Sequence, residues 1–132
     1  MTAAIARRIA IALGLVLAVA TAGCGSSSAS DKSAVTRLVD DFAAAHDRRA
    51  CDLLSPLGLA DVYGAGNATQ GRAKCVAASP RFRSGPVTIV QVKFHGSGNS
   101  TVISRNPQTG RHYTVTASKY GSHWLIDRIT SP

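Results

Sequence analysis

The chain contains no glutamate, one methionine and one tryptophan, and only 5% of its residues are aromatic. All of its acidic residues are therefore aspartates, so a catalytic carboxylate would have to come from aspartate. The sequence also lacks a Gly-Lys-Ser/Thr phosphate loop, a serine nucleophile elbow and paired metal-ligand spacing. These absences exclude the corresponding enzyme classes, and we expect no metal and no cofactor.

The N-terminal segment has the layout of a secretory signal peptide. Arg7 and Arg8 precede an uninterrupted apolar stretch over residues 9–20, and small residues then lead to Cys24. The apolar stretch is too short for a relaxed membrane span, which needs about 20 residues. We therefore expect a leader over residues 1–23, which is removed on export.

The residues Thr21-Ala22-Gly23-Cys24 resemble the lipobox of bacterial lipoproteins, although Thr21 replaces the usual leucine. The resemblance implies cleavage before Cys24, lipid on its thiol and an anchored position on the outer face of the cell membrane. A flexible Gly/Ser tether would then occupy residues 24–31 and the folded domain residues 32–132. Ordinary secretion after Ala22 and an uncleaved membrane anchor are the alternatives.

The number of cysteines favours the lipoprotein interpretation. The chain has three cysteines, and an exported protein seldom keeps an unpaired exposed thiol. If Cys24 is lipidated, Cys51 and Cys75 remain as one pair in an oxidising compartment. We then expect a disulfide between them, which would stabilise the domain by about 3 kcal/mol.

The chain is strongly basic, with 15 lysines and arginines and a formal net charge of +8. Outside a cell such a charge favours phospholipid headgroups or acidic wall polymers over nucleic acid. A local basic cluster before the first expected strand could bind an anionic partner or be a solvated face; it consists of Arg72, Lys74, Arg81 and Arg83.

The first half of the domain predicts helices. Apolar residues at positions i, i+3, i+4 and i+7 indicate a long helix over residues 32–49, which Asp31 or Ser33 could cap. Short helical turns interrupted by Pro56 are expected over residues 51–63, and another short helix over residues 69–79.

The second half predicts strands over residues 87–94, 100–105, 111–119 and 123–130, separated by short turns. Short connections join antiparallel neighbours, so we expect a four-stranded meander. Helices followed by strands indicate the α+β class, with the long helix packed on one face of a curved sheet.

The chain resembles the nuclear-transport-factor-2-like (cystatin-like) superfamily of α+β cones in this order of elements. It also resembles that superfamily in its closing residues, Trp124-Leu125-Ile126-Asp127-Arg128-Ile129, and in the turn before them, Lys119-Tyr120-Gly121. The resemblance implies a pocket between the helix and the concave sheet. Some relatives use that pocket for ketosteroid isomerisation or polyketide cyclisation, and others for small ligands or dimer contacts. No position matches a catalytic motif of those enzymes.

His46 is the most notable candidate for that pocket. It lies eleven residues after Val35 and therefore on the apolar side of the expected helix, although a satisfied core histidine is the simpler interpretation. The large side chains expected in the core or pocket are Phe42, Tyr63, Phe94, Tyr113 and Trp124.

Three functions remain open. The first is a non-enzymatic lipoprotein domain that binds a small apolar ligand or a partner protein at the membrane surface. The second is a pocket enzyme of the isomerase/cyclase kind, and the third is a basic binder of anionic wall polymers or lipid headgroups. A buried Asp or His that converges on an open cavity would favour the enzyme.

Overall fold

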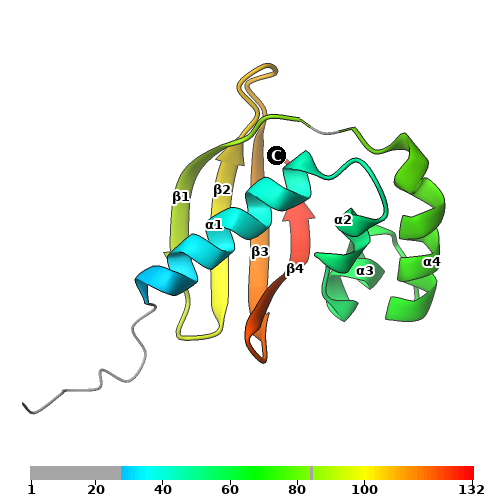
Figure 1. The fold of residues 1–132 in the computed structure, drawn as a ribbon, viewed down its shortest axis with the longest axis horizontal. Coiled ribbons are helices and arrows are strands. Elements are labelled where there is room, and N and C mark those ends of the chain that lie inside the picture. Colours follow the sequence, from blue (N-terminus) through cyan, green and yellow to red (C-terminus); the bar gives the residue numbers. More distant parts are fainter. Residues whose placement is uncertain (1–27, 84) are drawn as a thin grey trace, which may run out of the picture.

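The computed structural model describes residues 28–83 and 85–132, so the expected leader, Cys24 and most of the expected tether lie outside the described residues. The fold is α+β: helices pack on a four-stranded antiparallel sheet in the order β1-β2-β3-β4 (Figure 1). The elements are α1 (Ala29–Ala44), α2 (Arg49–Asp52), α3 (Pro56–Val62), α4 (Ala68–Ala78), the 3₁₀ turn η1 (Ser79–Arg81), β1 (Thr88–Phe94), β2 (Asn99–Arg105), β3 (His112–Tyr120) and β4 (His123–Thr130).

Helix α1 begins earlier than the sequence indicated. The Ser28 hydroxyl accepts a hydrogen bond from the Asp31 backbone N–H at 3.1 Å, so Ser28 is the N-cap in place of Asp31 or Ser33. The last part of the expected tether therefore belongs to the helix and its cap. The apolar periodicity is confirmed in its central part, where Val35, Leu38 and Val39 are buried.

Helix α1 also ends earlier than expected, and the placement of His46 on its apolar side is wrong. Ala45 is extended, with φ −67° and ψ 130°, and His46 is exposed in the connection that follows. The Asp47 carboxylate accepts the Arg49 backbone N–H at 2.8 Å and starts the separate helix α2. Such local bonding by aspartate competes with helix continuation, which the apolar periodicity alone does not reveal.

Two glycines allow helix α3 to pack closely against β4 and helix α4 to pack closely against α3. Pro56 occupies the first turn of α3, and the Ser55 hydroxyl caps this helix by accepting the Gly58 N–H at 3.0 Å. A β-carbon on Gly58 would lie 2.1 Å from the Ile126 carbonyl oxygen, and one on Gly71 would lie 2.2 Å from that of Leu59. No larger residue fits at either contact without a backbone shift.

The strands follow the predicted meander, and the helical segment after α2 extends the sheet. Each pair of consecutive strands is antiparallel, with a bulge in β1 and another in β4. Leu54 forms a parallel bridge with Ile126, supported by the Ser55 N–H to Ile126 carbonyl bond of 2.9 Å. The edge of β4 is therefore partly covered by the start of the helical lobe, defined as α2, α3 and α4.

One face of the sheet packs against α1. The buried core combines the apolar side of this helix with Val102, Val115, Ala117 and Ile126 from the sheet. In Figure 1, α1 crosses this face while the helical lobe lies beside β4. Within residues 28–83 and 85–132, no helix is long and apolar enough to cross a membrane.

Candidate functional site

A cavity of about 240 Å³ lies between the second half of α1 and the sheet. The connection from η1 to β1 closes one side, and the Gly85 N–H donates to the Ala43 carbonyl oxygen of α1 at 3.0 Å. The cavity is lined by Val39, Phe42, Ala43, Arg83, Gly85, Pro86, Val87, Ser104, Asn106, Tyr113, Val115 and Ile129. Three separate parts of the chain therefore form one site.

Most of the cavity wall is apolar, as is typical of sites for small organic ligands. Valine, phenylalanine and isoleucine side chains from α1, β3 and β4 supply this surface. A larger hollow of about 480 Å³ runs along the outward side of α1, but one helix alone lines it. The first cavity is therefore the better enclosed candidate.

The polar groups of the cavity wall are a small set from the ends of the strands and the η1–β1 connection. Ser104 is 2% exposed, and no side-chain hydrogen bond joins it to another described residue. The side-chain oxygen Oδ1 of Asn106 accepts the backbone N–H groups of Gln108 and Thr109 at 2.8 and 3.2 Å. These bonds orient the Asn106 side chain, so that its NH₂ group points toward Gly85.

The structure separates the residues expected to share a pocket. Phe42 and Tyr113 line the cavity. Phe94 and Trp124 instead pack against each other, with ring centroids 5.8 Å apart, and Tyr63 packs against the core as a half-buried side chain whose pKa is raised by burial. His46 lies beside a different hollow, next to Asp47 and Ser79.

An interaction between α1 and the β3–β4 hairpin fixes Trp124. The Lys119 ammonium group and the Trp124 indole N–H both donate to Asp31 Oδ1, at 2.9 and 3.1 Å. The hydrogen bond from Lys119, followed by that from Trp124, holds the pKa of Asp31 below its ordinary value of 3.8. Trp124 thus has a structural partner in the described fold.

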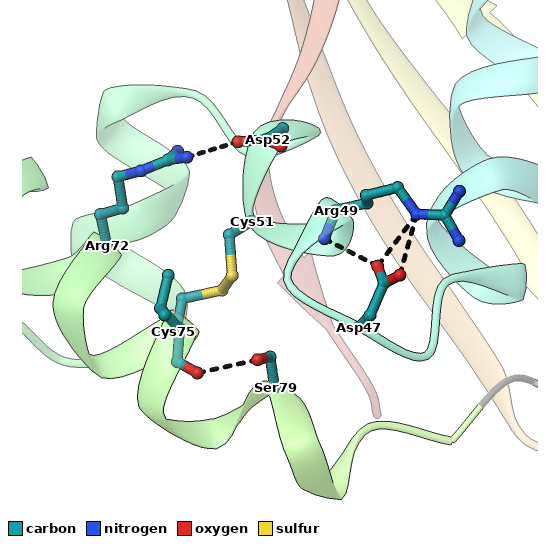
Figure 2. The surroundings of a disulfide bond; sticks show 8 residues. Asp47, Arg49, Cys51, Asp52, Arg72, Cys75 and Ser79 are labelled. Atoms are coloured by element: carbon teal, nitrogen blue, oxygen red, sulfur yellow. Dashed lines mark hydrogen bonds and ion pairs between the residues drawn. A yellow bond between two sulfur atoms is a disulfide. The ribbon is translucent and has the colours of Figure 1, made fainter.

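The four residues of the expected basic cluster have different surroundings. Arg72 forms an ion pair with Asp52 at 2.5 Å, and Lys74 approaches the carbonyl oxygens of Tyr63 and Gly64 at 3.5 Å (Figure 2 shows the Arg72 pair). Arg81 in η1 and Arg83 are both exposed, and Arg83 also lines the cavity. Of this cluster, Arg83 is the member connected to the candidate site.

The disulfide lies in the helical lobe and not at the cavity. Cys51 of α2 and Cys75 of α4 are joined, with Cα atoms 6.0 Å apart, and both residues are fully buried (Figure 2). The nearby Asp52–Arg72 ion pair joins the same two helices at the surface, and the local Asp47–Arg49 pair lies at the start of α2. These contacts support the lobe that flanks β4.

A second polar cluster surrounds Asp127, which is 7% exposed. Ser55 and Tyr120 donate to Asp127 Oδ1 at 2.5 and 3.0 Å, and Ser118 donates to Oδ2. The bulge in β4 lies at Asp127 and turns this side chain toward Ser118, on the face of the sheet opposite α1. The carboxylate therefore links the start of α3 to the β3–β4 hairpin and does not line the cavity.

Sequence reasoning missed Ser104, Asn106 and Asp127 as site or cluster residues. The alternation of β2 could have placed Ser104 on the same face as Val102. Asp127 could not be placed by alternation, since the bulge in β4 changes the phase there. Asn106 can be recognised as a cavity residue only once the fold places its turn beside the η1–β1 connection.

No family model, curated protein or solved structure gives a significant match to this chain. The site is therefore interpreted from its own chemistry.

Proposed function

We propose that this protein is a lipid-anchored extracytoplasmic lipoprotein whose domain binds a small apolar ligand, without catalysis, in the cavity between α1 and the sheet. The observation that carries the proposal is the open cavity of about 240 Å³ with a mainly apolar wall. The order of helices and strands is compatible with the α+β cone that the sequence resembles, and we include that family assignment in the proposal.

The anchor is the part of the proposal that comes from the sequence. The basic residues, the apolar stretch and the lipobox-like segment before Cys24 indicate export and lipidation. The Cys51–Cys75 pair leaves Cys24 as the odd cysteine, as expected if Cys24 carries lipid. The domain would then act at the outer face of the cell membrane.

The residues that line the cavity favour binding over acid–base catalysis. The described lining contains no carboxylate and no imidazole, whereas isomerases and cyclases of the expected kind need such a group within reach of the substrate. Asp127 is buried on the other face of the sheet, and His46 lies beyond the end of α1. We therefore place ligand binding first.

Ligand binding is tested by titration with hexanol, a neutral apolar probe, followed by calorimetry and by NMR shifts of Val39 and Ile129. Ala43→Leu should fill the cavity and weaken binding by about tenfold, a loss of about 1.4 kcal/mol. Ala44→Leu is the matched control, because Ala44 is the next residue of α1 but is exposed and lies outside this cavity. Equal binding by both variants would place hexanol elsewhere and contradict the proposed site.

The anchor is tested by intact mass and thiol labelling of the protein recovered from bacterial membranes. We expect an N-terminus at acylated Cys24, no reactive thiol, and loss of the lipid in Cys24→Ala. An unmodified chain beginning at Gly23 with one reactive thiol would make the protein a freely secreted one.

A further inference from the structure

The polar groups of the cavity wall are hydrogen-bond donors. Asn106 faces the cavity through its NH₂ group, because its carbonyl oxygen is already bonded to two backbone N–H groups. Arginine offers only donors, and the hydroxyl groups of serine and tyrosine can donate as well as accept. The wall thus presents donors from Arg83, Ser104, Asn106 and Tyr113, and no carboxylate from a described residue opposes them.

Ser104 contributes a nearly buried hydroxyl group to the cavity wall. Its side chain is 2% exposed, lines the cavity and makes no side-chain hydrogen bond with another described residue. Buried polar groups in folded proteins are usually hydrogen-bonded, because burying a polar group without a partner raises the free energy of the folded state. A ligand acceptor in the cavity can accept a hydrogen bond from the Ser104 hydroxyl group.

Arg83 adds a positive charge to this donor set. Its Nη1 donates to the Phe82 carbonyl oxygen at 3.0 Å, which orients the guanidinium group, while the side chain also lines the cavity. No ion pair joins Arg83 to an acidic residue within the described part of the chain. A carboxylate is the small group that fits a planar guanidinium together with neighbouring N–H and O–H donors.

We infer that the ligand is a short amphiphile with a carboxylate head, held by Arg83, Asn106 and Ser104, and an apolar tail against Phe42, Val115 and Ile129 of the cavity wall. At roughly 30 Å³ for each water-sized group, the cavity holds about eight non-hydrogen atoms, the size of hexanoate. This inference rests on the proposed function, since it names the chemical class of the ligand for the same cavity.

The test compares hexanoate with hexanol by calorimetric titration of the full chain as recovered from the producing cells, with protein-free buffer as the blank. Hexanoate should bind at least about fivefold more tightly, because charge-assisted hydrogen bonds are stronger than neutral ones. Arg83→Met should remove this preference by weakening hexanoate binding more than hexanol binding. Arg81→Met is the matched control, since Arg81 is an exposed arginine two residues away that does not line the cavity.

Ser104→Ala provides an independent measurement, because it changes one buried hydroxyl group and conserves the fold. It should weaken hexanoate by about threefold or more and hexanol less. Equal affinity of hexanoate and hexanol, unaffected by Arg83→Met, would overturn the carboxylate inference and leave the proposed function standing. Binding of neither probe would overturn both.

Discussion

At the residue scale, Asp127 is the polar group with the largest expected effect on stability. Its buried carboxylate accepts from the hydroxyl groups of Ser55, Ser118 and Tyr120, which come from the start of α3 and from β3. The pKa of Tyr120 is raised overall. The hydrogen bond with the Ser55 hydroxyl lowers this pKa, but burial and the Asp127 carboxylate raise it more. One acceptor thus serves three donors.

Asp127→Ala should lower the free energy of unfolding by about 3 kcal/mol, because three hydroxyl groups lose an acceptor and, among the described residues, only Ser118 keeps another, Asn99 Oδ1. Urea denaturation followed by circular dichroism measures this loss. Asp61→Ala is the control, since its ion pair with Arg128 at 3.3 Å is exposed and should contribute less than about 1 kcal/mol. Equal losses in the two variants would show that the Asp127 cluster adds nothing beyond a surface pair.

At the element scale, the approach of α4 to α3 depends on Gly71. A β-carbon there would lie 2.2 Å from the Leu59 carbonyl oxygen, so Gly71→Ala should destabilise the protein by about 3 kcal/mol or prevent folding, despite the better helix propensity of alanine. The midpoint of urea unfolding measures the change. Gly66→Ala is the matched control, because its nearest neighbour would be the flexible Gln70 side chain at 3.4 Å, and it should change little.

The contact of α1 with the β3–β4 hairpin should depend on pH through Asp31. Its pKa is lowered in the folded state by the Lys119 and Trp124 hydrogen bonds, so the unfolded chain binds a proton more readily than the folded one. The stabilisation is therefore fully present above pH 3.8 and is lost as the pH falls through the lower folded-state pKa.

Urea midpoints for the wild type and Asp31→Asn, measured from neutral pH down to pH 2, test this expectation. The difference between the two proteins should be constant above about pH 5 and shrink on acidification, and Trp124 fluorescence should follow the same change. Asp40→Asn, an exposed change on the same helix, is the control. A wild-type advantage that persists unchanged at pH 2 would contradict the assigned role of Asp31.

The alternation of residues in the second half of the chain was enough to predict all four strands and their meander order, because each strand has one face on the core and is joined by a short turn. The periodicity of α1 was confirmed for its buried residues but failed at His46, which lies beyond the end of α1 and before α2. Phe42 and Tyr113, expected in the core or pocket, both line the cavity. Arg83 and Asn106 required the long-range approach of the η1–β1 connection, which no local pattern encodes.

At the scale of the whole molecule, the cavity and the disulfide lie in different parts of the described fold. The cavity is formed by α1, the sheet and the η1–β1 connection, while the helical lobe carries the disulfide and flanks β4. The lobe joins the sheet through the Leu54–Ile126 bridge and the Asp127 cluster. Stability and ligand binding should therefore be separable by mutation.

The double variant Cys51→Ala/Cys75→Ala tests that separation. The two cysteines are 24 residues apart, and releasing this loop should lower the free energy of unfolding by about 3 kcal/mol, because the unfolded chain regains the entropy that the crosslink removes. Thermal unfolding measures the loss, and wild type treated with a reductant should approach the same value. Hexanol affinity, measured well below the melting temperature, should stay within about twofold of wild type, since neither cysteine lines the cavity. A parallel loss of affinity in the folded variant would mean that the lobe shapes the cavity after all.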